Sequence, residues 1–157
     1  MAARSKVIGV GNRWRGDDAA GLAAARRVSS MPGLEVEVAE LESDPTSLLD
    51  AWEGTEHVIV IDAVCSGAQP GTVHRLDANA TSLPRELDRH STHAVGLATA
   101  IELGRVLGRL PPRLIVFGIE GERFDAGAGL TPSVADAVAR TVASVADELR
   151  ARTGSRG

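Results

Sequence analysis

The sequence has little of several features that mark particular protein classes. Its 157 residues include a single cysteine, Cys65, so no disulfide can form within the chain, which fits a reducing compartment. No apolar run approaches the length of a membrane span, and the N-terminal residues lead into a predicted strand without the apolar core of a signal peptide. The formal net charge of −4 and the scattered arginines provide no basic surface for a nucleic acid. We therefore expect a cytoplasmic protein that binds neither membranes nor nucleic acids.

Small and aliphatic residues, in contrast, are abundant. Seventeen glycines and 43% apolar residues accompany two tryptophans, two phenylalanines and no tyrosine, which indicates an aliphatic core with many tight turns. A chain of this length can bury one substantial core and is too short for two ordinary domains. We expect one domain over residues 1–153 and a frayed tail at 154–157.

Apolar periodicity predicts a regular alternation of strands and helices. Strands are expected at 5–10, 34–41, 57–64, 72–77 and 113–118, and helices at 17–30, 44–52, 91–107 and 131–153. The 57–64 segment is almost uninterruptedly β-branched, which is typical of a central strand buried on both faces. The 72–77 segment follows without a helical crossover and should be antiparallel to its neighbours. This order predicts an α/β fold, in which helices cover both faces of a mostly parallel sheet and the first and third strands are central.

The most unusual stretch follows the first predicted strand, where glycines frame two carboxylates. It spans residues 9–21 and reads GVGNRWRGDDAAG. The glycine spacing resembles a phosphate-binding loop, but Asp17 and Asp18 stand where that loop continues with lysine and a hydroxyl residue. Two carboxylates would repel a phosphate. The loop therefore indicates a metal cation or acid–base chemistry.

Two further candidate ligands belong to the same crevice, because the carboxyl ends of the first and third strands meet there. Asp62 ends the third predicted strand, and His93 begins the helix that follows the antiparallel strand. With an aspartate of the first loop they form a set that suits zinc, nickel or a similar divalent ion. Structural roles remain open for each: Asp17 can be the N-cap of the first helix, which would leave Asp18 as the ligand, and Asp62 can cap a loop.

Other polar and aromatic residues receive weaker assignments. Trp14 lies on the exposed first loop and is a candidate for substrate contact. Glu120 follows the last strand and is a candidate to line the crevice. We interpret Cys65 as a small packed residue, and we expect His57 and His74 to lie away from the crevice without a role.

At four groups of residues the sequence resembles the hydrogenase maturation proteases, endopeptidases that trim the C-terminal extension from the large subunit of nickel–iron hydrogenase. The matching residues are Gly9-Val10-Gly11-Asn12 with Asp17-Asp18 and Gly21; Ile61-Asp62-Ala63 with Pro70-Gly71-Thr72-Val73; His93-Ala94-Val95-Gly96-Leu97; and Gly118-Ile119-Glu120 with Leu130-Thr131-Pro132-Ser133-Val134. One departure lies at residues 40–44, ELESD, where the family usually has a turn like Gly-Gly-Thr. This difference affects one wall of the crevice and therefore the choice of precursor.

The resemblance implies a three-layer α/β/α sandwich of the phosphorylase/hydrolase-like type, with strand order 2-1-3-5-4 and the fourth strand antiparallel. It implies that Asp18, Asp62 and His93 engage a metal and, with Asp17, form the catalytic set. The expected metal is nickel carried by the substrate, although zinc or cadmium can occupy such a site, and no organic cofactor is implied. The expected partner is the large-subunit precursor of a nickel–iron hydrogenase. The alternatives are a non-catalytic metal-delivery or checkpoint protein for the same subunit and, more weakly, a nucleotide-binding domain.

Overall fold

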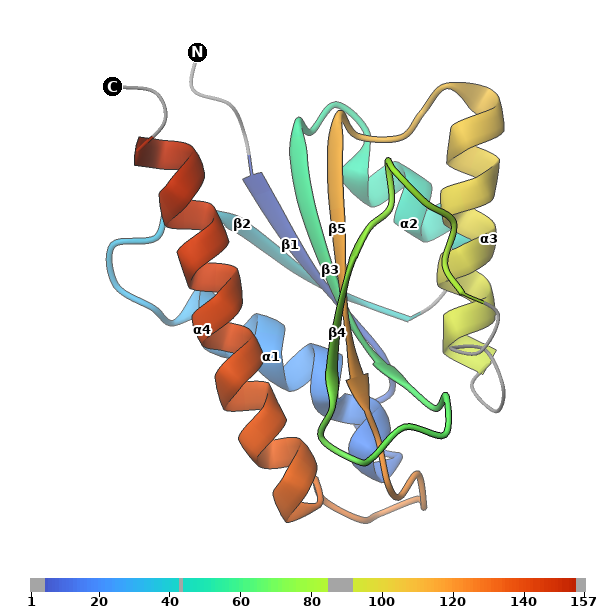
Figure 1. The fold of residues 1–157 in the computed structure, drawn as a ribbon, viewed down its shortest axis with the longest axis vertical. Coiled ribbons are helices and arrows are strands. Elements are labelled where there is room, and N and C mark those ends of the chain that lie inside the picture. The colour runs from blue at the N-terminus through green and yellow to red at the C-terminus, as the bar shows by residue number, and fades with distance from the viewer. Residues whose placement is uncertain (1–4, 43, 85–91, 155–157) are drawn as a thin grey trace.

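One mixed sheet of five strands forms the centre of the molecule, in the order β2-β1-β3-β5-β4 (Figure 1). The computed structural model describes residues 5–42, 44–84 and 92–154, with the side chains of 5–42, 44–84 and 96–152. Its strands are β1 (Ser5–Val10), β2 (Glu37–Leu41), β3 (His57–Val64), β4 (Val73–Asp77) and β5 (Arg113–Glu120). All neighbouring strands are parallel except β4, which pairs antiparallel with β5. The predicted strand order, the central β1 and β3 and the reversed β4 are confirmed.

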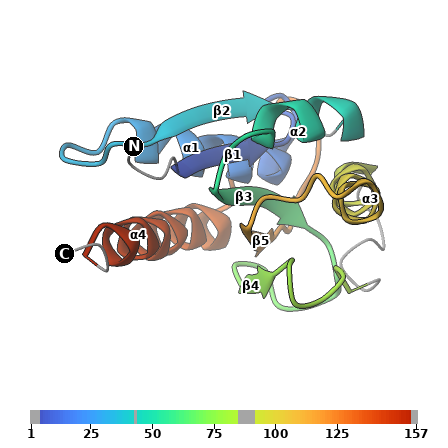
Figure 2. The same cartoon turned by 90° about the horizontal axis from the view of Figure 1, so that it is seen from above.

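Helices cover both faces of this sheet, as predicted. They are the short 3-10 helix η1 (Gly16–Ala19), α1 (Ala20–Ser29), α2 (Pro45–Trp52), α3 (Thr92–Leu107) and α4 (Pro132–Gly154). Apolar residues of α1 and α4 pack together on one face, and those of α2 and α3 pack together on the other. Figure 2 shows α4 and α3 on opposite sides of the central strands. Within the described ranges, no helix combines the length and apolar character that crossing a membrane requires.

The side chains of β3 alternate between the two faces of the sheet, and this alternation determines the face on which Asp62 lies. All eight residues of the strand are buried. Ile59 and Ile61 belong to the core beneath α1 and α4, whereas Val58 and Val60 belong to the core beneath α2 and α3. Because successive side chains of a strand point to opposite faces, Asp62 lies on the same face as Val60. This is the face that α3 covers.

The element boundaries differ from the prediction mainly around the first helix. Neither aspartate caps α1, because the chain first forms η1 and the N-cap of α1 is Ala19, which makes no side-chain capping bond. The prediction that Asp17 caps this helix is therefore wrong. Asp44 caps α2, since its carboxylate accepts a hydrogen bond from the backbone N of Ser47 at 3.2 Å. The last strand, β5, runs to Glu120, two residues beyond its predicted end at Gly118.

The helix α1 lies directly against the backbone of the central strands because Gly21 has no side chain. A Cβ atom at Gly21 would lie 2.3 Å from the carbonyl oxygen of Ile61 and 2.5 Å from that of Val10. A Cβ atom at Gly9 would in turn lie 2.5 Å from the carbonyl oxygen of Gly21. Contacts this short exclude any side chain at either position, so the two glycines set how closely η1 and α1 approach the ends of β1 and β3.

At the opposite end of the sheet, β3 begins with a fully buried histidine. The side chain of His57 is 0% exposed, and its Nδ1 lies 3.2 Å from Ser5 Oγ. Burial, together with the positive charges of Arg152 and Arg113, lowers the pKa of His57 from 6.5 to about 4. The imidazole is therefore neutral in the folded protein near neutral pH.

We predict that mild acid destabilises the protein through His57. As the pH falls from 6.5 towards 4, the unfolded chain binds a proton at this imidazole that the folded chain does not, so the free energy of unfolding decreases. At pH ~4.5 this loss should reach about 2 kcal/mol, given about 1.4 kcal/mol per pKa unit. Urea unfolding of the wild type and His57→Gln at pH ~7 and ~4.5 measures it. The variant should lose less stability between the two pH values, and an equal loss would contradict the prediction.

Candidate active site

Two buried carboxylates lie at the carboxyl edge of the central strands. The parallel pairing of β1 and β3 runs to Gly9 and Ile61, so Asp62 lies beside the last residue of β1. The chain leaving β1 then forms η1, which contacts β3 and carries Asp18. Asp62 is 0% exposed and Asp18 is 2% exposed. Burying a carboxylate costs free energy unless the group is paired, hydrogen-bonded or metal-bound, which makes this edge the first candidate for a reactive site.

The third expected ligand, His93, lies in the first turn of α3, because that helix begins at Thr92. Figure 1 shows the first turn of α3 at the end of the molecule where β5 ends, and α3 covers the face on which Asp62 lies. The side chain of His93 is outside the described side chains. Among the side chains that are described, no group of three or more His, Cys, Asp or Glu is arranged to hold a metal.

Asp17 connects two loops of the site. Its Oδ2 accepts hydrogen bonds from the backbone N of Glu122 at 2.8 Å and of Arg123 at 2.9 Å. Its Oδ1 accepts one from the backbone N of Thr131 at 2.8 Å, and the Thr131 hydroxyl donates to Oδ2 at 2.9 Å. Both oxygens of Asp17 thus bind the loop between β5 and α4. Of the two neighbouring aspartates, Asp18 is therefore the better candidate for a ligand.

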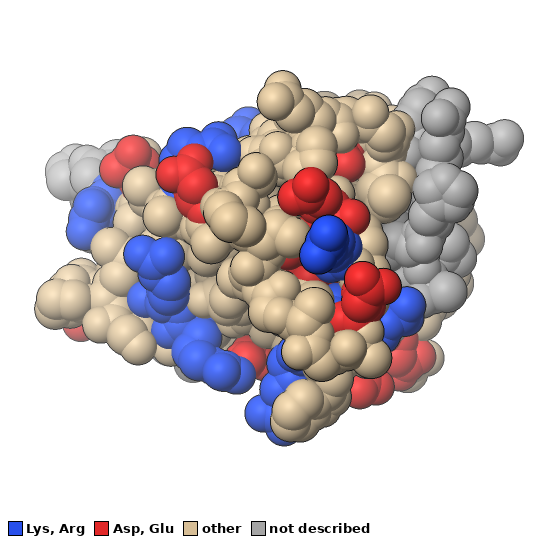
Figure 3. All heavy atoms as spheres, turned by 90° about the horizontal axis from the view of Figure 1, so that it is seen from below, with Lys and Arg blue, Asp and Glu red and all other residues tan. Residues whose placement is uncertain are grey.

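The loop between β1 and η1 presents an aromatic side chain to solvent. Trp14 is 68% exposed, and the guanidinium of Arg13 lies 4.9 Å from the centroid of its ring. The backbone of Trp14 is held on both sides, by a bond from its N to Asn12 Oδ1 at 2.9 Å and from Gly127 N to its carbonyl at 2.8 Å. Figure 3 shows the molecule from below and reveals acidic and basic side chains interspersed over this face. The backbone of Trp14 is thus held in place, and its indole is exposed to solvent.

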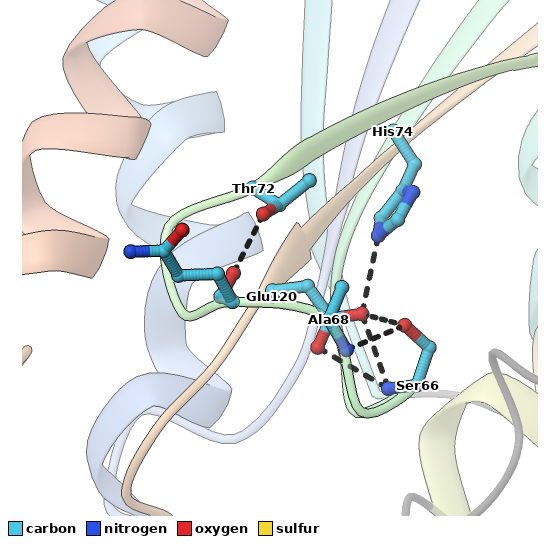
Figure 4. Close-up of polar contacts among 6 residues, drawn as sticks. Ser66, Ala68, Thr72, His74 and Glu120 are labelled. Carbon is cyan, nitrogen blue, oxygen red and sulfur yellow. Dashed lines mark hydrogen bonds and ion pairs between the residues drawn. The ribbon is translucent and has the colours of Figure 1, made fainter.

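Sequence reasoning named Glu120 as a candidate to line the crevice but missed the polar cluster around it at the same edge (Figure 4). Glu120 is 1% exposed and accepts a hydrogen bond from the backbone N of Ser66 at 3.1 Å and another from the Ser66 hydroxyl. The Nε2 of His74 lies 3.1 Å from Oε1 of the same carboxylate. The expectation that His74 lies away from the crevice is wrong, because the reversed direction of β4 brings its first residues to the edge where the parallel strands end. The predicted reversal of this strand was the signal that could have located it.

Cys65 lies beside this cluster, and its environment disfavours a reactive thiolate. Burial raises the pKa of the Cys65 thiol, and the negative charge of Glu120 raises it further. A cysteine nucleophile requires the opposite shift. The site therefore does not present a cysteine-protease arrangement around this residue.

We predict that substitutions of the two neighbouring aspartates lower the free energy of unfolding by different amounts. Asp17→Ala should lower the free energy of unfolding by roughly 2–4 kcal/mol, because each buried donor that loses its acceptor costs about 1–3 kcal/mol. Asp18→Asn, which keeps the size of the side chain, should lower it by less than about 1 kcal/mol. Urea unfolding of both variants gives the comparison. A larger loss for Asp18→Asn than for Asp17→Ala would contradict these assignments.

Comparison with known proteins places this chain in a family. The sequence model of the hydrogenase maturation protease family matches residues 23–148. The hydrogenase expression/formation protein HupD of Rhodobacter capsulatus is 29% identical over 151 residues, which cover 94% of this chain and 72% of that protein. The hydrogenase 2 maturation protease of Escherichia coli is also 29% identical over 151 residues, covering 94% of this chain and 91% of the relative. The structure of the hydrogenase maturating endopeptidase HybD from Escherichia coli superposes with a TM-score of 0.79 at 28% identity, covering 94% of this chain and 92% of that one. The chain therefore belongs to the hydrogenase maturation protease family.

Proposed function

We propose that this family member removes the C-terminal extension from a nickel-loaded hydrogenase large-subunit precursor, and that Asp18, Asp62 and His93 bind the nickel that the substrate carries. The observation that carries the proposal is the placement of Asp18 and Asp62. They come from different elements, and both are buried at one edge of the sheet. The first turn of α3, with His93, lies on the face where Asp62 lies.

The chemistry of this donor set supports the proposal. Imidazole suits nickel and zinc, and carboxylates add the negative charge that attracts a divalent cation. Nickel bound to the substrate would polarise the carbonyl of the bond to be cleaved. Asp18 and Asp62 would hold the substrate at this edge, and one carboxylate would orient the attacking water. Zinc or cadmium would fit the same ligands, whereas Asp17 and Asp18 disfavour a bound phosphate and hence a nucleotide.

The protein would meet its substrate in the cytoplasm under this proposal. The single cysteine, whose thiol pKa is raised, fits a reducing compartment. A protein that binds the precursor without cutting it is the remaining alternative, and the same assay distinguishes it.

We predict that Asp62→Ala and His93→Ala abolish trimming of the precursor without unfolding the protein. Each variant is mixed with nickel-loaded and nickel-free precursor, and mass spectrometry follows the shortened subunit. We expect a loss of at least ~100-fold with either variant, and cleavage by the wild type only when nickel is present. Asp50→Ala, at a carboxylate that is 69% exposed on α2, is the matched control and should cleave normally. Full processing by both site variants would overturn the metal assignment, and binding without cleavage by the wild type would favour the non-catalytic alternative.

Trp14 is proposed as a contact for the precursor, because its indole is exposed and its backbone is held on the loop that leads to Asp18. Trp14→Ala should raise KM about 5–20-fold and change kcat by less than about twofold, as expected for loss of an aromatic contact worth about 1–2 kcal/mol. Its stability should stay unchanged, since the side chain is 68% exposed. Val106→Ala on α3, where the side chain is 83% exposed, is the control for removing an exposed apolar group. An unchanged KM for Trp14→Ala would refute the contact.

A further inference from the structure

We propose that His74, oriented by Glu120, is a further catalytic residue that accepts a proton from the attacking water and delivers it to the departing amine. This inference rests on the endopeptidase activity of the family. It concerns the polar cluster of Glu120, Ser66 and His74, which is distinct from the residues assigned above to nickel.

Strand register places His74 in line with Asp62. Asp62 on β3 and His74 on β4 both pair with Gly118 of β5, so the three residues form one row across the sheet. Neighbouring strands are about 4.8 Å apart, which separates the Cα atoms of Asp62 and His74 by about 10 Å. No side chain projects between them from β5, because the middle residue is glycine.

The two side chains also lie on the same face. Leu76, two residues after His74 on β4, belongs to the core beneath α2 and α3, as does Val60, two residues before Asp62 on β3. Since side chains alternate along a strand, His74 and Asp62 both face the side that α3 covers. The side chain of Val64 lies over Gly118 on this face, because a Cβ atom at Gly118 would lie 3.1 Å from Val64 Cγ1 and 3.8 Å from His74 Cβ.

Glu120 sets the orientation and the tautomer of the imidazole. Its carboxylate is buried and lies 3.1 Å from His74 Nε2, so this nitrogen carries the hydrogen and donates it. The Nδ1 atom then has a lone pair that can accept a proton. The side chain of His74 is 26% exposed, so part of it reaches the protein surface. A carboxylate that orients an imidazole in this way is a recurrent general-base arrangement.

Ser66 keeps Glu120 in place independently of His74. Its backbone N donates to Glu120 at 3.1 Å, and its hydroxyl makes a second bond (Figure 4). These bonds also attach the loop that follows β3 to the end of β5. The described titratable groups near the imidazole on this face are Glu120 on β5, Asp62 on β3 and Cys65 in that loop.

The proton balance of the step is complete. One O–H bond of water breaks as its oxygen bonds to the carbonyl carbon, and the proton moves to His74 Nδ1. When the C–N bond of the peptide breaks, the same proton passes from Nδ1 to the amine nitrogen. The imidazole returns to its neutral form, and the reaction needs no co-reactant besides water.

The test compares wild type and His74→Gln on nickel-loaded precursor. Glutamine can still donate an N–H to Glu120 but cannot take up a proton, so we expect kcat to fall at least ~100-fold with KM within about threefold. In His74→Ala, added imidazole should restore part of the rate.

Arg75→Gln is the matched control. It lies on the same strand but on the other face, where its guanidinium pairs with Glu148 of α4, and it should cleave at the wild-type rate. A His74→Gln variant with wild-type kcat would overturn the inference, as would failure of imidazole to rescue His74→Ala. Either of these two results would leave the proposed function intact. A wild type that does not cut the precursor would overturn both the proposed function and the role of His74.

Discussion

The close contact between α1 and the two central strands is the constraint on which the rest of the structure depends. Two glycines, Gly9 and Gly21, allow backbone to lie against backbone, at separations where any Cβ atom would overlap a carbonyl oxygen. This contact fixes the position of the chain that follows β1, and hence the position of η1 and its two carboxylates. Asp17 then joins η1 to the loop before α4, so two segments more than 100 residues apart in sequence meet at one edge of the sheet. The conspicuous glycines of this motif are therefore requirements of packing, and the chemistry lies with the residues between them.

Most of the fold could be predicted from the sequence, because its signals are local and consistent. The β-branched run of β3 gave a strand buried on both faces, and the absence of a crossover before β4 gave its reversed direction. The start of α1 was less predictable. An aspartate before a helical segment usually suggests a cap, but here the chain inserts a 3-10 turn and Asp17 reaches residues more than 100 positions away. No local pattern encodes a contact between such distant segments.

The candidate site was predictable to a similar degree. The position of Asp62 at the end of an apolar strand, and of Asp18 after β1, follows from the topology of parallel sheets. The cluster around Glu120 was not found, because the sequence shows Ser66, His74 and Glu120 as isolated polar residues in separate elements. Only the pairing register of β4 and β5 brings them together. The pairing register of a strand depends on which of its faces buries apolar groups. Because β4 is short and polar, its register could not be predicted from the sequence.

The antiparallel direction of β4 also affects which insertions and deletions the turn before it can tolerate. The turn from 65 to 72 connects β3 to β4 at the functional edge, so inserting or deleting one residue there can shift the pairing of β4 by one position. Such a slip turns every side chain of β4 to the opposite face of the sheet. His74 would then point towards α4, and either Val73 or Arg75, depending on the direction of the slip, would take its place in the row with Asp62. In both cases the row would lose the proposed proton acceptor. The length of this turn therefore sets which side chain of β4 faces Glu120 and Asp62, although the turn itself contributes only Ser66 to the cluster.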